Sequence, residues 1–497
     1  MVTWPRREAR HVSTRLEHHM PRPASLPLRH RTGRLAAAAL GLVLAASGAI
    51  AVVEGPAAGT PTTGVAAKAK AKAKRDNVVT PGNFTGYGFD QCLAPKQSKM
   101  DRWLEYSPFL AVGIYISGDS RACRDQPNLT PTWVSTQLAK GWRLLPITLG
   151  PQASCQPRYP RYGTDVTIDP TRAANTGTYV NAYTQGVNEA NKSVGAAAAL
   201  GIVAGSTLWY DLEGFSYGNT KCRESALSFL SGWTQQLHAL GYVSGVYSSA
   251  GSGMKALDEV RVSRPTAYTL PDQIWVARWD GLANTSVNPT YMRSDGWAKA
   301  RVKQYQGGHY ETWGNVRINI DRNFLDVGTG SVAVPETHCG GIPVAFSSYP
   351  TLLAASSGRT SNPRKVQALQ CLLQEQGTYA GPIDGVFSDG LVQAVNAWQG
   401  PHNLAVQPAW SREAWLTLLS AGSTPVLKFG SAGVEVRRLQ RALKSTISSD
   451  ARKALRPTGV FDSRTDAAVR AYQTRLGLNV SGVANTQTWA ALQAGRR

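Results

Sequence analysis

Short apolar runs alternate with helical patterns over most of the chain. The apolar runs lie at 84–90, 109–117, 142–149, 207–213, 243–248, 273–280, 302–306 and 317–321. Segments with helical periodicity lie between them, for example at 130–140, 172–200 and 223–240. Eight strands alternating with helices over about 240 residues predict an α/β fold of the TIM-type (β/α) barrel class.

Two carboxylates end the fourth apolar run. Asp211 and Glu213 are two residues apart, so their side chains share one face of the strand and lie about 7 Å apart along it. Neighbouring carboxylates repel, and one of them tends to keep its proton. Splitting a glycosidic bond needs one protonated acid and one ionised partner. The plainer interpretation of the pair is a solvated strand end.

Other polar residues end the neighbouring runs. Barrel active sites lie at the carboxyl-terminal ends of the strands, so one rim should collect Asp90, Asp211, Glu213, Asp280, Gln304 and Asp321. Aromatic residues lie nearby, and inward aromatic positions of such barrels are usually packed core. Tyr247 and Tyr305, near strand ends, are the best exceptions. The candidate substrate-binding residues are Gln304, Tyr305, Tyr247, Asp280 and Tyr115.

The last third of the chain contains an internal repeat. Residues 366–373 are similar to 436–443 at an offset of 70, and three later pairs are similar at an offset of 74: 385–387 and 459–461, 397–399 and 471–473, 415–418 and 489–492. Two copies of a helical unit are therefore expected. A duplicated small module favours binding through avidity.

The repeat resembles the peptidoglycan-binding domain 1 family over residues 362–421 and 430–494. The shared pattern is V-x-x-L-Q-x-x-L, then G-x-F, then an aromatic residue followed by Gln, then W-x-x-L. The first copy departs from it with Gly400-Pro401-His402, where a helix normally continues. The resemblance implies peptidoglycan as the partner.

Residues 84–327 resemble a secreted glycoside-hydrolase-like family, domain of unknown function 1906. The motifs that carry the resemblance are GFDQC at 88–92, GIYISG at 113–118, YDLE at 210–213, GVYS at 245–248 and IWVARW at 274–279. That family is similar to the glycoside hydrolase family 25 lysozymes. The resemblance assigns Asp90, Asp211 and Glu213 to the lysozyme site and, with a departure in spacing, Asp321. It implies a barrel that acts on peptidoglycan glycan.

Two functional hypotheses follow. In a muramidase-like hydrolase, Glu213 is the general acid, Asp211 raises its pKa and orients water or the substrate, and Asp90 and Asp321 stabilise developing positive charge. Alternatively, the same carboxylates hold sugar in a non-catalytic wall-binding protein. An amidase or peptidase lacks support, since the sequence has neither a metal-ligand cluster nor a G-x-S-x-G motif. No metal or cofactor is expected.

Charge and an N-terminal apolar segment indicate export. The net charge is +21, and residues 336–497 hold 17 Lys/Arg against 9 Asp/Glu, which suits an anionic cell wall. No basic cluster is interleaved with aromatics, so nucleic acid is not an expected partner. Arginines precede an apolar run at 35–48 that ends in Ala49-Ile50-Ala51, typical of a cleaved signal. An uncleaved anchor is the rival; after cleavage no membrane span is expected.

The predicted organisation places a signal at 1–51, an Ala/Lys linker at 52–80, the barrel at 81–335, and modules at 336–424 and 425–497. Six cysteines follow the signal, and an even number in an exported chain indicates disulfides. Among the 15 possible pairings we expect the sequential one, 92–123, 155–222 and 339–371. The location predicted is secreted, extracellular or cell-wall associated.

Overall fold

The computed structural model describes residues 77–156, 164–354, 357–358, 360–447 and 454–497. The expected signal and most of the expected linker lie outside the described residues. Residues 77–80 are already bonded to the barrel: the Thr80 hydroxyl donates to the Leu144 carbonyl at 2.8 Å. In the described part of the chain, no helix is long and apolar enough to span a membrane.

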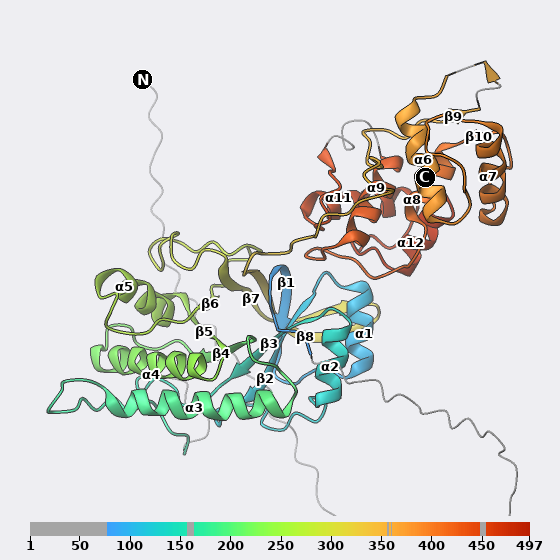
Figure 1. Ribbon diagram of the computed structural model, residues 1–497. Helices are drawn as coiled ribbons and strands as arrows, with labels where there is room; N and C mark the ends of the chain where they lie inside the picture. The colour runs from blue at the N-terminus through green and yellow to red at the C-terminus, as the bar shows by residue number, and fades with distance from the viewer. Residues whose placement is uncertain (1–76, 157–163, 355–356, 359, 448–453) are drawn as a thin grey trace, which may run out of the picture. The chain divides into compact units, whose positions relative to one another are not determined.

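The barrel predicted from the apolar runs is confirmed. Its eight strands close in sequence order: β1 (Phe84–Asp90), β2 (Ala111–Ser117), β3 (Arg143–Thr148), β4 (Thr207–Leu212), β5 (Val243–Ser249), β6 (Gln273–Ala277), β7 (Ala300–Trp313) and β8 (Val316–Val327). Neighbours from β1 through β7 are parallel (Figure 1).

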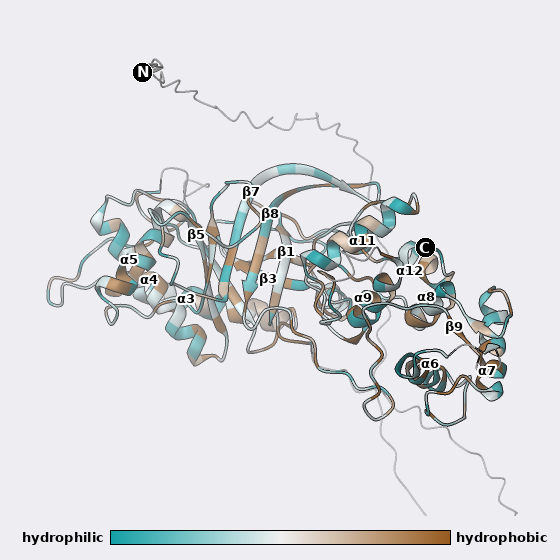
Figure 2. Ribbon diagram, turned by 90° about the horizontal axis from the view of Figure 1, so that it is seen from above, coloured by the Kyte–Doolittle hydropathy of each residue, from teal (hydrophilic) through white to brown (hydrophobic). Residues whose placement is uncertain are grey.

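The last two strands depart from the regular alternation. Between β7 and β8 the chain has only Gly314 and Asn315, both with positive φ, 55° and 63°. That backbone matches the two-residue turn of a tight hairpin, so β8 runs antiparallel to β7 and to β1. Many residues of this hairpin are hydrophilic (Figure 2).

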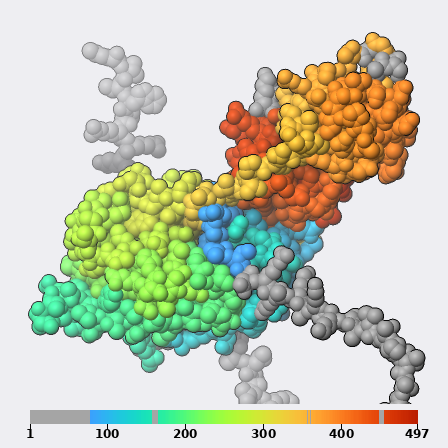
Figure 3. All heavy atoms as spheres, viewed as in Figure 1, coloured from blue at the N-terminus to red at the C-terminus, as the bar shows by residue number. Residues whose placement is uncertain are grey.

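Helices cover the outside of the barrel. They are α1 (Gln97–Tyr106), α2 (Pro131–Ala139), α3 (Val180–Ala199), α4 (Thr220–Ala239), the π-helical turn η1 (Ala250–Met254) and α5 (Lys255–Ser263). The prediction that a helix starts at 172 is wrong, because Gly177 takes φ 68°, which interrupts a right-handed helix before α3. The adjacent α3 and α4 form a continuous face (Figures 1 and 3).

The barrel interior has two layers. The layer nearer the start of the parallel strands is apolar and includes Phe84, Ala111, Leu145, Ile147, Trp209, Trp275, Val302, Leu325 and Val327. Trp209 and Trp275 meet edge to face with ring centroids 5.6 Å apart. This layer closes the barrel, because side chains fill the interior of an eight-stranded barrel. The next inward residues along the strands are polar and form the site described below.

All three predicted disulfides are confirmed: Cys92–Cys123, Cys155–Cys222 and Cys339–Cys371. The first joins the segment after β1 to the segment after β2. The second joins the segment after β3 to the first turn of α4. Both therefore brace loops at the rim where the parallel strands end.

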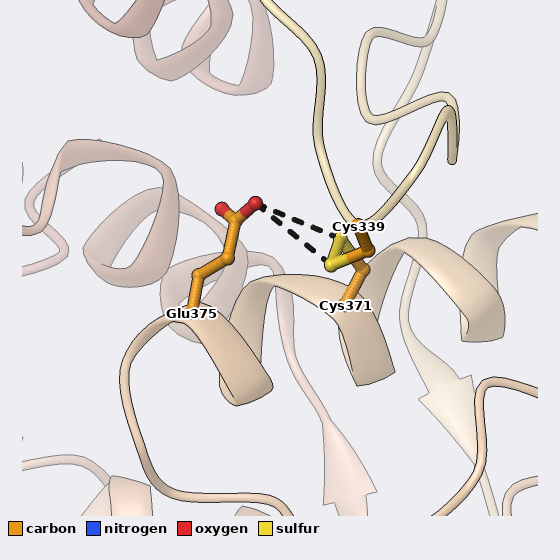
Figure 4. Close-up of side chains that lie close together, drawn as sticks. All are labelled: Cys339, Cys371 and Glu375. Carbon is orange, nitrogen blue, oxygen red and sulfur yellow. Dashed lines mark hydrogen bonds between the residues drawn. A yellow bond between two sulfur atoms is a disulfide. The ribbon is translucent and has the colours of Figure 1, made fainter.

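The third disulfide lies in the C-terminal region beside an acidic residue. One carboxylate oxygen of Glu375 lies 3.8 Å from the Cys339 sulfur and 3.9 Å from the Cys371 sulfur (Figure 4). The two sulfurs are bonded to each other, so they supply no thiolate pair to a metal ion. We therefore assign Cys339, Cys371 and Glu375 a structural role and not a metal-binding one.

The predicted helical modules are confirmed. Their helices are α6 (Pro363–Glu375), α7 (Asp389–Gln399), the 3₁₀ turn η3 (Gly400–His402), α8 (Arg412–Ser420), α9 (Val434–Thr446), α11 (Ser463–Arg475) and α12 (Thr486–Gln493). Two short strands pair in the first module, β9 (Leu352–Leu353) and β10 (Ala409–Trp410).

Equivalent side chains of the repeat make equivalent hydrogen bonds. Gln370 accepts from the Gly385 amide, and Gln440 accepts from the Gly459 amide, both at 2.9 Å. Later in each copy, the indole of Trp415 donates to a proline carbonyl at 2.9 Å and that of Trp489 at 2.7 Å. These equivalent hydrogen bonds show that the two copies of the repeated sequence adopt the same local fold.

Candidate active site

Asp90 ends β1 and lies inside the barrel, 5% exposed. It is paired in register with Asp321 on the antiparallel strand β8. Asp321 therefore lies at the same rim as Asp90, although it is in the middle of β8 and not at the end of a strand. Asn323, the next inward residue of β8, donates to Asp90 Oδ1 at 2.6 Å and accepts from the Trp275 indole at 2.8 Å.

Gln304 on β7 connects both sides of the site. Its Nε2 donates to Asp90 Oδ1 at 3.2 Å and to Asp321 Oδ2 at 3.3 Å. Its Oε1 accepts from the Tyr247 hydroxyl at 3.0 Å and from the Trp279 indole at 2.9 Å. Because donors meet one end of the amide and carboxylates the other, the side chain has one satisfied orientation.

Asp211 and Glu213 approach from β4. Asp211 is 3% exposed, and its Oδ2 accepts from the Tyr115 hydroxyl at 3.2 Å. Gln152, in the segment after β3, accepts from the Glu213 backbone amide at 2.9 Å and donates to the Asp211 carbonyl at 2.8 Å. The end of β4 is therefore fixed by a buried side chain from its neighbour.

Burial and mutual repulsion raise the pKa values of two carboxyl groups. Burial is the largest cause for Asp321, and the charges of Asp90 and Glu213 add to it, which brings its pKa to about 8. Burial also raises the pKa of Asp90, to about 6, although hydrogen bonds from Asn323 and Gln304 oppose the shift. The site therefore holds a proton among its carboxyl groups at neutral pH.

The two tyrosines at the site remain neutral hydrogen-bond donors. Burial is the main cause that raises the pKa of Tyr115 and of Tyr247 well above the ordinary value. The charges of Asp211 and Glu213 raise both values further. Each tyrosine therefore lies near both acids of β4, as expected if the two acids share one face.

A cleft of about 530 Å³ opens beside these residues. Glu213, Tyr247, Arg278, Trp279 and Tyr291 are among the residues that line it. A cleft of this size accommodates a small ligand. The arrangement combines an acidic group, neutral hydroxyl donors and an exposed aromatic ring, which are groups that a carbohydrate site uses.

Two family models match regions of the chain. Residues 101–325 match the family model described as Rv2525c-like, glycoside hydrolase-like domain, and residues 362–407 and 432–492 match that of a putative peptidoglycan binding domain. The chain therefore combines a region similar to the Rv2525c-like, glycoside hydrolase-like domain with two regions similar to a putative peptidoglycan binding domain. The match to the first model begins at residue 101, after Asp90. No functionally curated protein matches the chain.

Several solved structures are similar to about half of the chain. An uncharacterised protein of B. stearothermophilus has 19% identity and a TM-score of 0.32, covering 48% of this chain and 95% of its own. The Tat-secreted protein Rv2525c of Mycobacterium tuberculosis has 12% identity and a TM-score of 0.32, covering 50% and 98%. The catalytic domain of endolysin ply40 from a Listeria monocytogenes bacteriophage has 14% identity and a TM-score of 0.27, covering 49% and 93%. TM-scores this low say nothing about activity.

Two candidate residues of the glycoside hydrolase-like domain make contacts outside this cluster. Asp280 lies beyond the end of β6, where its carboxylate accepts from the buried ammonium of Lys303 at 3.1 Å. Tyr305 follows Gln304 on β7 and so points to the opposite face, where it is near Arg322. The prediction that all strand-end acids converge is therefore wrong for Asp280, because β6 ends at Ala277.

Gln152 and Asn323 escaped the sequence-based list of candidates, and Trp279 was among the aromatic residues expected to be packed core, although it is 64% exposed. Gln152 lies in a loop, so no periodicity marks it. Asn323 belongs to the late Asp-x-Asn segment, and its position two residues after Asp321 was a signal for it. Trp279 lies two residues after the end of β6, and its exposure could not be inferred from an apolar run.

Proposed function

We propose that this is an exported cell-wall protein whose barrel hydrolyses the glycan strands of peptidoglycan and whose modules hold it on the wall. One observation carries the proposal: four carboxyl groups, Asp90, Asp211, Glu213 and Asp321, surround one rim of a closed barrel beside an open cleft. Glycosidases require such a set, because one group must donate a proton while another stays ionised.

In the proposed mechanism Glu213 is the general acid, since it lines the cleft where a leaving oxygen has access. Asp211 lies two residues before Glu213 on the same face of the strand, deeper in the barrel. It holds a negative charge near Glu213 and orients the water or acetamido group that attacks the anomeric carbon. The neighbouring Asp90, whose pKa of about 6 leaves it mostly ionised at neutral pH, stabilises the positive charge that develops on the sugar ring, and Asp321 adds to this once it has lost its own proton. Gln152 positions the end of β4 on which both acids depend.

Incubation of purified peptidoglycan with the full chain tests the proposal. New reducing ends are expected, and reduction followed by mass spectrometry identifies which sugar carries them. Asp211→Asn should slow the release by about 10²-fold or more, the low end of what acid–base groups contribute. It should also shift the alkaline limb of the pH profile to lower pH, because the charge of Asp211 no longer helps the general acid Glu213 to keep its proton. Retention on the wall without any release supports the alternative, a wall-binding protein that holds glycan uncleaved.

A further inference from the structure

Trp279 is held in place although its ring is exposed. Its indole nitrogen donates to Gln304 Oε1 at 2.9 Å, so the ring is tied to the central residue of the site. The ring also lies against Gly307: a Cβ there would come within 2.6–2.7 Å of three ring atoms. Even so, 64% of Trp279 is exposed. One face of a fixed indole is covered by backbone, and the other is available to a ligand.

Arg278, the preceding residue, is oriented by an aromatic ring instead of an acid. Its guanidinium carbon lies 5.0 Å from the centroid of the Tyr291 ring. In the part of the chain that the structure describes, it forms no ion pair. By contrast, Arg261, Arg264 and Arg293 of the same region all pair with carboxylates. Arg278 thus brings an uncompensated positive charge to the cleft.

Both residues line the cleft that contains Glu213. A flat indole and a guanidinium on neighbouring residues can contact one ring and one anionic substituent of that ring together. The guanidinium fork matches a carboxylate through two parallel hydrogen bonds. The indole face suits the apolar face of a sugar ring.

We propose that Trp279 and Arg278 form a subsite for a sugar that carries a carboxylate, next to Glu213. The subsite specifies the substrate class of the function proposed above and rests on it for its role in the cell. In peptidoglycan the carboxylate has two sources: the lactyl group of a muramic acid without its peptide, or the stem peptide when it is attached. Neutral glycans such as chitin oligosaccharides lack both.

Binding to the full chain carrying Glu213→Gln tests the subsite without cleavage of the ligand. Three ligands are titrated calorimetrically: short peptide-free glycan strands, the same strands with stem peptides, and chitin oligosaccharides of equal length. Arg278→Gln should weaken binding of at least one carboxylated ligand by tenfold or more, since hydrogen bonds to charged groups contribute about 1.5–3 kcal/mol. It should leave chitin binding unchanged. The carboxylated ligand that loses affinity identifies the source.

Trp279→Ala should weaken binding of all three ligands by about threefold to tenfold, as an aromatic contact of about 0.5–1.5 kcal/mol implies, and Trp279→Phe should restore most of it.

The matched control for Arg278→Gln is Arg317→Gln, which removes the same charge from an arginine held 4.0 Å over Tyr310, outside the cleft. The modules are identical in every variant, so differences belong to the barrel. Equal weakening of chitin by Arg278→Gln, or equal losses from Arg317→Gln, would overturn the subsite. Binding with this pattern but no cleavage by the wild type would refute the proposed hydrolysis alone.

Discussion

Gly113 on β2 leaves the space that the Asp90 side chain occupies. A Cβ at this position would lie 2.6 Å from Asp90 Cβ and 3.1–3.2 Å from atoms of Ile147 and Trp275. The nearest of these atoms, Asp90 Cβ, is fixed to the backbone of β1, so something must move. At the scale of single residues, the site therefore depends on a missing side chain as much as on its acids.

Gly113→Ala should lower the free energy of unfolding by about 1–3 kcal/mol, the usual cost of overpacking, and should impair any cleavage by displacing Asp90. Thermal melts of the full chain measure the first effect. Gly195→Ala is the matched control, because Gly195 lies within α3 with no atom near its Cβ position; alanine there should stabilise slightly. Equal stability of both variants would contradict the packing argument.

Asp321 makes the stability of the barrel depend on pH. Its pKa is about 8 in the folded protein against an ordinary value of 3.8, so the folded state binds the proton more tightly. The stabilisation is complete below about pH 4 and is lost as the pH rises towards 8. Asp321→Asn, which mimics the protonated group, should raise the melting temperature little at pH 4 and by several degrees at pH 8.

Melting curves of the Asp321→Asn protein at pH 4, 6 and 8 provide the measurement, and Asp125→Asn, in an exposed loop, provides the control. A difference between Asp321→Asn and the wild type that does not grow with pH would mean that Asp321 is not strained by burial and by the charges beside it.

At the scale of elements, the sequence predicted the positions of the strands well, but it did not predict the direction of β8 or the position of Asp280. Alternation of apolar runs and helical patterns located all eight strands, because burial on both faces requires continuous apolar runs. It could not show that β8 returns antiparallel, which a two-residue turn decides. It also could not place Asp280, whose partner Lys303 lies 23 residues away along the chain.

The Cys155–Cys222 disulfide should stabilise the segment that positions the end of β4. Gln152, which fixes the Glu213 amide, lies three residues before Cys155. Replacing both cysteines by Ser should lower the free energy of unfolding by about 2–4 kcal/mol and should reduce cleavage well below the melting temperature. The pair Cys339/Cys371, changed in the same way, should leave cleavage of soluble glycan intact. Equal loss of activity from both double variants would contradict this role.

At the scale of the whole molecule, the two modules share one hydrophobic core that is separate from the cores of the barrel. The first helix of the second module, α9, packs on α8 of the first, and Gln493 of α12 donates to the Ser420 carbonyl at 3.1 Å. The sequence repeat predicted two modules, but the periodicity could not reveal that they fold against each other.

Residues 336–497 should therefore fold alone and sediment with insoluble peptidoglycan, whereas residues 336–424 should melt at a much lower temperature because α8 loses its partner. Circular dichroism melts and pelleting assays measure these outcomes. High salt should release only the electrostatic part of the binding. A stable, fully binding fragment of residues 336–424 would show that the shared core is unimportant.

The release of reducing ends from purified peptidoglycan tests the central claim most directly. The full chain and its Glu213→Gln variant, which keeps the shape of the side chain but cannot deliver a proton, are compared at equal amounts of wall-bound protein. We predict release by the wild type and a loss of about 10²–10⁴-fold in the variant, with unchanged melting temperature and wall retention. No release by the wild type from any wall preparation, or full activity in Glu213→Gln, would contradict the account.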